Sequence, residues 1–326
     1  MRFFAHAKYP FLEWRYRAYV ATGLMLALGI GAMIFNGLGG RGWLNYGVDF
    51  TGGTIVQVHF NHPVHADEVR AAANAGGASD WEITQFGTDQ EYVVRMRSFG
   101  QETGRDAQAK TTRVLSSKFT PQKDFVVART EAVGPKAGAE LQTNALIAVL
   151  LSFLAILGYL AIRFEWRFGL AAILATAHDI LITLGFLAVT RTEIGLGTVA
   201  AVLTVVGYSM HDTIIVFDRI RENLARPRHG LTLMGLMDRS INETLPRTVL
   251  TAGTVLATLL ALLIWGGPVI RPFAEVLFLG ITIGTFSSIF VASPALHAIE
   301  SKWPRKEDKS PTRSKSASRP PAQTAV

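Results

Sequence analysis

The chain of 326 residues contains no cysteine, and charged residues make up only 17% of it. Without cysteine it forms no disulfide and supports no thiol chemistry. It also lacks a glycine-rich nucleotide-binding loop, a serine nucleophile elbow and a zinc-protease helix. Any work that such a chain performs draws on a gradient or on a partner, so the sequence predicts a protein that is neither an enzyme nor a cofactor carrier.

Hydrophobic residues, by contrast, are abundant at 49% of the chain. They are concentrated in runs long enough to cross a hydrocarbon core, which takes about 20 helical residues. The net charge of +7 comes from Lys and Arg placed beside these runs and in the C-terminal tail, a pattern typical of membrane topology and lipid headgroup contact. No surface of basic and aromatic residues suited to nucleic acid is visible. We therefore expect a membrane protein that contacts the lipid bilayer and binds no nucleic acid.

Six transmembrane helices are predicted from the apolar runs, at residues 18–38, 142–162, 168–189, 195–217, 248–265 and 273–297. The first run follows Arg15 and Arg17 and has no small-residue cleavage site after it, which indicates an uncleaved span. By the positive-inside rule residues 1–17 lie in the cytoplasm, and so does the basic tail 301–326, which is expected to be disordered. Residues 141–300 then form a five-helix bundle, to which the first span adds a sixth helix.

A soluble pattern occupies residues 39–140, between the first two spans. It predicts, in order, a strand at 54–60, a helix at 63–75, strands at 81–86 and 91–97, a helix at 103–118 and a strand at 124–133. This β-α-β-β-α-β order is typical of a ferredoxin-like α+β domain. The positive-inside rule places this domain on the extracytoplasmic side.

Two breaks are expected near the fifth span. Residues 231–245 are predicted to form a separate amphipathic helix in the membrane interface, and Pro246-Arg247 then precedes the span that begins at 248. At the far end of this span, Gly266-Gly267-Pro268 is predicted to break the helix.

Asp212 lies deep in the fourth apolar run, between valines and isoleucines on both sides. A carboxylate at such depth is costly, and such residues usually mark an ion or proton pathway. Desolvation disfavours the charged form of a carboxyl group, so a group of this kind can load and unload a proton. The alternative is that Asp212 only hydrogen-bonds to a neighbouring helix.

Three other residues are candidate neighbours of Asp212. Asp179 lies near the middle of the third span, and it and Asp212 can share a proton as a coupled pair or be kept apart by a cation. Arg247, at the entrance of the fifth span, is either a counter-ion that reaches into the bundle or an interfacial anchor. His211 precedes Asp212 as His178 precedes Asp179, but adjacent helical residues point about 100° apart, which argues against a metal site in either dipeptide.

At the end of the fourth span, Asp218, Arg219, Arg221 and Glu222 form a charged cluster. Its spacing predicts ion pairs from Asp218 to Arg221 and from Glu222 to Arg226. The cluster is either a solvated helix end, or a hinge or partner contact at the cytoplasmic face.

Several motifs together resemble the SecF subunits of the SecD/SecF family of protein-export membrane proteins, over about residues 10–300. The motif after the first span contains Gly47, Asp49, Phe50, Gly52 and Gly53. The others are Val133-Gly134-Pro135 with Glu140-Leu141, His178-Asp179, Gly207-Tyr208-Ser209 with Asp212-Thr213, the segment from Asp218 to Asn223, Asn242 to Thr244 with Arg247-Thr248, and Gly266-Gly267-Pro268. Two residues depart from the family pattern: His211 stands where Asn is expected, and Phe217 where a small residue is commoner.

The resemblance implies a function and a set of partners. It implies a subunit of the bacterial inner membrane that, with SecD, forms a twelve-span unit similar to RND transporters and uses the proton-motive force to assist late protein export through the SecYEG channel. Its implied contacts include the translocating preprotein and, indirectly, SecA and YajC. It also implies that Asp212 lies in the proton path and that Arg247 is its basic partner, whereas His211 can join the relay.

Two other functions remain open from the sequence. One is a subunit of an RND-type small-molecule exporter, although an outer domain of about 100 residues is small for such a role. The other is a membrane scaffold or insertion aid, in which Asp212 and Arg247 are replaceable. We expect copurification with SecD and the channel, or with an outer-membrane tunnel protein, to separate these classes.

Overall fold

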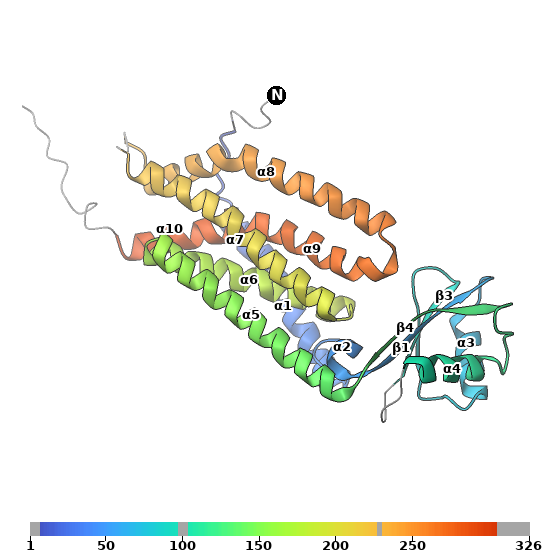
Figure 1. Ribbon diagram of the computed structural model, residues 1–326. Helices are drawn as coiled ribbons and strands as arrows, with labels where there is room; N and C mark the ends of the chain where they lie inside the picture. Colours follow the sequence, from blue (N-terminus) through green and yellow to red (C-terminus); the bar gives the residue numbers. More distant parts are fainter. Residues whose placement is uncertain (1–6, 97–103, 227–229, 305–326) are drawn as a thin grey trace, which may run out of the picture.

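The structure is a computed structural model that describes residues 7–96, 104–226 and 230–304. A bundle of long helices makes up most of it, and a small α+β domain projects beyond one end of the bundle, as Figure 1 shows. We call this end the domain end and the other the opposite end. Both the first described residues and the last helix lie toward the opposite end.

Within the described residues, the bundle contains six helical segments long and apolar enough to cross a membrane, as predicted. They are α1 (Arg15–Leu38), α5 (Pro135–Arg163), α6 (Trp166–Thr190), α7 (Leu196–Leu224), α8 (Leu233–Trp265) and a last run, Val269–Lys302, made of α9 (Gly267–Ser287), a π-helix η1 (Ser288–Ala292) and α10 (Ser293–Lys302). Several are longer than their apolar runs, because a helix continues where its polar ends leave the hydrocarbon.

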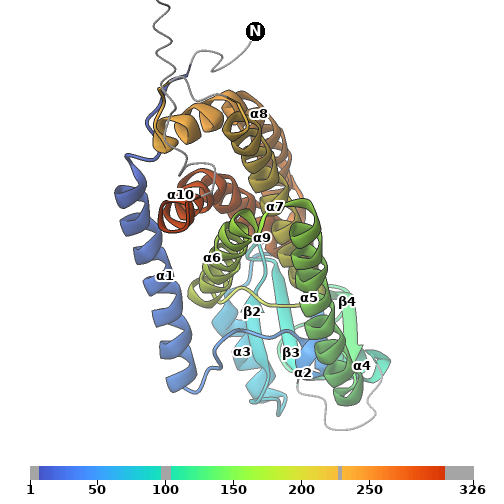
Figure 2. The same ribbon diagram turned by 90° about the vertical axis from the view of Figure 1, so that its left-hand side faces the viewer.

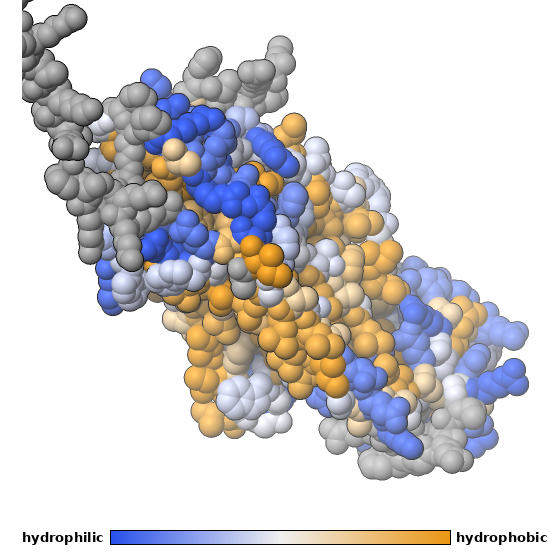
Figure 3. Space-filling view, turned by 60° about the vertical axis from the view of Figure 1, so that its left-hand side comes forward, coloured by the Kyte–Doolittle hydropathy of each residue, from blue (hydrophilic) through white to orange (hydrophobic). Residues whose placement is uncertain are grey.

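The outer surface of this bundle is apolar. Figure 3 shows hydrophobic residues over the middle of the helices, with hydrophilic residues at the opposite end and on the α+β domain. Large exposed side chains on α1 and α5 contribute to this surface, among them Leu28, Leu146 and Leu150. A soluble protein rarely exposes so much contiguous apolar surface, so lipid is the solvent that fits it.

The α+β domain consists of β1 (Gly53–Phe60), α3 (Ala66–Ala75), β2 (Glu82–Gln85), β3 (Glu91–Met96), α4 (Gly104–Leu115) and β4 (Phe125–Val133). The elements follow the predicted order, and the antiparallel sheet has the strand order β2-β3-β1-β4. Alternate residues of β1, such as Val56 and Val58, are fully buried in the core that α3 and α4 complete. The intervening residues, such as Ile55 and Gln57, lie on the other face of the sheet and line a cleft toward the bundle.

A short helix, α2 (Val48–Thr51), connects α1 to the sheet and was not predicted. Gly52 follows it with φ of 69°, and Gly53 has φ of 136°, so neither position suits a residue with a Cβ atom. A Cβ on Gly53 would also lie 2.9 Å from the carbonyl oxygen of Met96 on the neighbouring strand. The two glycines therefore let the chain turn from α2 directly into the sheet.

The predicted break at Pro246 is wrong. Pro246 lies inside α8, which runs without interruption from Leu233 to Trp265, and Figure 2 shows this helix crossing the opposite end of the bundle and then bending along it. Proline has a helical φ and costs one backbone hydrogen bond, so the result is a bend, held by the packing of α8 on α7 and α9. The break at Gly266-Gly267 is confirmed, since Gly266 caps both α8 and α9 and Gly267 has φ of 73°.

Helices α7 and α9 pack closely because small residues face each other. A Cβ on Gly280 would lie 2.2 Å from a methyl carbon of Val205, and one on Gly284 would lie 2.8 Å from the Cβ of Ser209. The two glycines are four residues apart, so they lie on one face of α9. This close approach brings the polar residues of the bundle core within hydrogen-bonding distance of one another.

Candidate functional site

Asp212 lies on α7 in the interior of the bundle, with 4% of its surface exposed. Its Oδ1 accepts a hydrogen bond of 2.8 Å from the Thr248 hydroxyl on α8, and its Oδ2 accepts one of 2.9 Å from the Ser288 hydroxyl at the start of η1. One carboxylate thus joins three helical segments through neutral donors. Both hydroxyls can also accept a hydrogen bond, so they can serve either protonation state of the carboxyl group.

Asp179, on α6, is 1% exposed and has a separate set of partners. Its Oδ2 accepts hydrogen bonds from the hydroxyls of Ser209 on α7 and Ser287 on α9, the second at 2.8 Å. Its Oδ1 lies 2.9 Å from Nδ1 of His178. Asp179 and Asp212 therefore have separate hydrogen-bond partners and make no direct hydrogen bond with each other.

The two sites are connected through the helices that carry their donors. Ser287 and Ser288 are consecutive, and each donates to a different carboxylate. Ser209 lies three residues before Asp212, one turn earlier on α7. The change from α-helix to π-helix begins at Ser288, and such π-helical turns are frequent at functional sites.

The sequence prediction did not include these hydroxyl donors. Thr248 was noted only as part of a family motif. The signal that could have found them is a hydroxyl side chain within an apolar run, because every polar group there needs a partner.

Arg247 and His211 lie beside the Asp212 site and do not contact its carboxylate. Both are exposed on the bundle surface in this chain, and within the described ranges neither forms an ion pair or a side-chain hydrogen bond with Asp212. Gly207 is exposed on the same helix. The structure thus does not place Arg247 as a contacting counter-ion; Thr248, the next residue, makes the contact instead.

The charged cluster at the end of α7 forms the two predicted ion pairs. Arg221 lies 2.8 Å from Asp218, and Arg226 pairs with Glu222. Further partners come from other helices: Arg163 of α5 reaches Asp218 at 3.1 Å, and Arg219 reaches Glu243 of α8 at 2.6 Å. The cluster therefore ties three helices together at the opposite end of the bundle.

The motif around α2 fastens the α+β domain to the bundle. The carboxylate of Asp49 accepts a 2.8 Å hydrogen bond from the backbone N–H of Leu196 and so caps the first turn of α7. Gly47 donates its N–H to the carbonyl of Ile194 at 3.0 Å, and a Cβ on Gly47 would lie 2.5 Å from the carboxylate of Glu193. Phe50 is buried against the bundle. The motif thus joins the start of the sheet to the start of the helix that carries Asp212.

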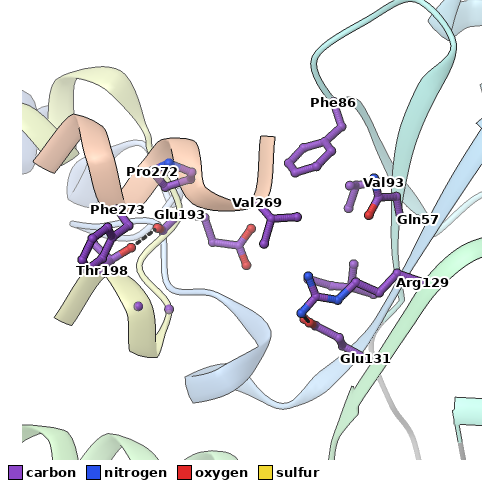
Figure 4. A pocket seen from close by; sticks show the side chains of 13 residues that line it. Gln57, Phe86, Val93, Arg129, Glu131, Glu193, Thr198, Val269, Pro272 and Phe273 are labelled. Carbon is purple, nitrogen blue, oxygen red and sulfur yellow. Dashed lines mark hydrogen bonds and ion pairs between the residues drawn. The ribbon is translucent and has the colours of Figure 1, made fainter. Parts of the chain in front are cut away.

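A cleft of about 220 Å³ separates the open face of the sheet from the domain end of the bundle. Figure 4 shows Phe86, Val93 and Arg129 on the sheet side and Val269 and Phe273 on the helix side, with Glu193 beside Val269. Glu193 also forms an ion pair with Arg95 of β3. Burial raises the pKa of the Glu193 carboxyl, and the Arg95 guanidinium opposes this shift. This ion pair is a direct polar link between the sheet and the α6–α7 loop.

No group of three or more His, Asp or Glu side chains within the described part of the chain is close enough together to hold a metal ion.

The fold and the site together define a class of protein: a helical membrane protein with an α+β domain at one end and buried carboxylates hydrogen-bonded to hydroxyl groups. The family model for the C-terminal region of the SecD/SecF protein export membrane proteins matches residues 114–302, and the model for the SecD/SecF GG motif matches residues 42–64. The chain belongs to the SecD/SecF family, and with six apolar helices in the part that the structure describes it is a multi-pass membrane protein.

Individual relatives agree with the family assignment. The chain is 49% identical to the protein translocase subunit SecF of Gemmatimonas aurantiaca, over 94% of this chain and 92% of that protein. It is 39% identical to the protein translocase subunit SecF of Escherichia coli O157:H7, over 87% and 86%. The crystal structure of SecDF from Thermus, a translocon-associated membrane protein, matches with a TM-score of 0.79 and 38% identity over 91% of this chain. This chain spans 39% of the length of that SecDF chain.

Proposed function

We propose that this chain is an accessory subunit of a protein translocase that uses the proton-motive force to promote export, with Asp212 as the group that takes up and releases the proton. The observation that carries the proposal is the Asp212 environment: a carboxylate 4% exposed, bound by two hydroxyls from two other helical segments. Within the described residues no cation neutralises it by direct contact. The relatives named above, which are translocase subunits, support the export role.

Protonation of Asp212 changes what its neighbours must do. The ionised carboxylate accepts from both Thr248 and Ser288. The protonated group is itself a donor, so one of the two hydroxyls has to turn and accept. Because these hydroxyls belong to α8 and η1, each protonation step alters the contacts that α7 makes with both helices. One charge moved across 100 mV supplies about 2.3 kcal/mol, enough to bias two arrangements of such contacts.

The α+β domain is mechanically connected to this helix. The first turn of α7 is capped by Asp49 of the domain motif, and the loop before it is bound to β3 through Glu193 and Arg95. A change in the position of α7 therefore acts directly on the base of the domain. We propose that the domain engages the emerging polypeptide and changes orientation with each proton.

The proposal includes an orientation in the membrane and a partner. The basic residues of the opposite end, such as Arg163, Arg219 and Arg226, support a cytoplasmic location for that end and for both termini, with the α+β domain outside. The bacterial inner membrane is the corresponding compartment. Because the chain corresponds to 39% of the length of SecDF, we propose that a SecD subunit supplies the remaining part and that the pair acts beside the SecYEG channel.

The test compares gradient-driven export in membrane vesicles containing wild-type protein, Asp212→Asn or Asp218→Asn. Asparagine retains hydrogen-bonding groups for Thr248 and Ser288 but cannot ionise, so Asp212→Asn is expected to lose gradient-driven export while still copurifying with SecD. Asp218 lies in the exposed ion-pair cluster, and its variant is the matched control with export retained. Gradient-driven export by Asp212→Asn at the wild-type rate contradicts the proposal, and copurification with an outer-membrane tunnel protein in place of the channel indicates an exporter.

A further inference from the structure

His178 has a buried ring nitrogen that no described group satisfies. The side chain is 9% exposed, its Nδ1 lies 2.9 Å from Oδ1 of Asp179, and its Nε2 is buried without a hydrogen-bond partner among the described residues. Most buried polar atoms in folded proteins have a partner, so an unpaired one requires an explanation.

The hydrogen bonds around an ionised Asp179 define which ring nitrogen of His178 carries the proton. The hydroxyls of Ser209 and Ser287 both lie within hydrogen-bonding distance of Oδ2 and donate to it when Asp179 is ionised. An ionised carboxylate only accepts, so Nδ1 of His178 must donate to Oδ1. In the neutral ring Nε2 then has a lone pair directed at no donor. It is the atom of this cluster that can accept a proton without breaking an existing hydrogen bond.

The charge of the cluster favours this step. Asp179 is 1% exposed, and no Lys or Arg of the described ranges forms an ion pair with it. A buried carboxylate without a counter-charge is costly, whereas a paired one is far less so. A proton on Nε2 converts the neutral ring and the carboxylate into an imidazolium–carboxylate pair with no net charge.

We propose that His178 and Asp179 form a second proton-binding site in the bundle, at which Nε2 of His178 takes up the proton and Asp179 stabilises the imidazolium. This inference rests on the proposed function, because it adds a second stage to the same proton-driven cycle. The site shares two helices with Asp212: Ser209 precedes Asp212 by one turn on α7, and Ser287 precedes Ser288. Occupation of one site therefore alters helices that also hold the other.

Few other titratable groups lie at this depth on the helices packed against α6. The neighbours are α1, α5, α7, α9, η1 and α10. The titratable groups of these helices away from the bundle ends are Tyr19 on α1, Tyr159 on α5, and Tyr208, His211 and Asp212 on α7. After Glu275, neither α9 nor η1 has a titratable residue. On α10, His297 and Glu300 lie toward the opposite end. The described titratable group that His178 contacts is instead Asp179, on its own helix α6.

The test is the ¹⁵N NMR signal of His178 in the intact complex, labelled at histidine and titrated from about pH 5 to about pH 8, the range in which histidines change charge. The signal is assigned by its loss in His178→Asn, whose amide nitrogen takes the place of Nδ1 beside Asp179 but leaves nothing at Nε2. His59→Asn, in the α+β domain, is the matched control and leaves the His178 signal in place. If His178→Asn fails to fold, His178→Gln provides the assignment.

The expected result is a Nε2 signal that changes from the neutral to the protonated position within this range and that shifts in Asp212→Asn. A His178 signal that stays neutral throughout overturns the inference. This outcome is distinct from failure of the proposed function. If Asp212→Asn still exports protein, the proposed function is contradicted, regardless of the protonation of His178. If Asp212→Asn loses export but the His178 signal does not respond to pH, only the second proton-binding site is contradicted.

Discussion

The contact between α1 and α6 depends on a pair of glycines, and a single methyl group is expected to break it. A Cβ on Gly29 of α1 would lie 2.6 Å from the Cα of Gly185 on α6, and the reverse distance is 2.7 Å. Carbon atoms that are not bonded approach favourably at about 3.5 Å or more, so Gly29→Ala pushes the two helices about 1 Å apart. Backbone atoms cannot rotate away as a side chain can, so neighbouring contacts, such as the 2.9 Å hydrogen bond from Asn36 to the carbonyl of Ala188, are strained too.

The same helix offers a matched control. Gly31 is exposed, and a Cβ there meets no atom within 4 Å. Gly31→Ala therefore changes only helix propensity, which favours alanine by up to about 1 kcal/mol. Gly29→Ala has the same benefit but adds an overpacking cost of about 1–3 kcal/mol. The free energy of unfolding of the two variants, measured by denaturant titration of purified protein in detergent micelles, is expected to differ by about that cost. Equal values would refute the packing described for α1 and α6.

Two further predictions concern the polar contacts. Thr248→Val removes a hydrogen-bond donor from the buried Asp212 carboxylate and is expected to lower the free energy of unfolding by about 1–3 kcal/mol. Thr254→Val, on an exposed turn of the same helix, is the control and is expected to change the free energy of unfolding by less than about 0.5 kcal/mol. Similar losses for both variants would argue against the contact between Thr248 and Asp212. For Glu193, burial raises the folded pKa above the unfolded value, so its stabilising contribution is complete at low pH and is lost as the pH rises through the folded pKa. The amide hydrogen exchange of β3, corrected for its intrinsic pH dependence, is therefore expected to be slower in acid. Glu193→Gln is expected to remove this difference. Corrected exchange rates in the wild type that do not depend on pH would contradict the prediction.

The helical architecture was predictable because it depends on length and hydropathy. Each apolar run of about 20 residues had to form a helix in lipid, and the alternation of Val56 and Val58 on β1 marked one buried face of a sheet. The break at Pro246 was mispredicted for a physical reason. Proline ends helices in isolation, but packing against α7 and α9 holds both halves of α8 in one helix.

The buried carboxylates were also predictable, but not their partners. Asp179 and Asp212 stand out because ionisable groups are rare in apolar runs. The pairing of Ser287 with one and Ser288 with the other depends on the rotation of α9 and on the π-helix after it, which the sequence does not reveal. For Arg247 the sequence left two roles open, a counter-ion of Asp212 and an interfacial anchor, whereas its neighbour Thr248 makes the contact with Asp212 in the structure.

The most direct test of the proton-coupling account is proton flux into liposomes that contain the complex of this chain with its SecD partner. If Asp212 carries the proton, the flux responds to an imposed potential in the wild type and in Asp218→Asn, and it falls to the level of protein-free liposomes in Asp212→Asn. An Asp212→Asn complex that is intact and conducts protons at the wild-type rate would contradict the account.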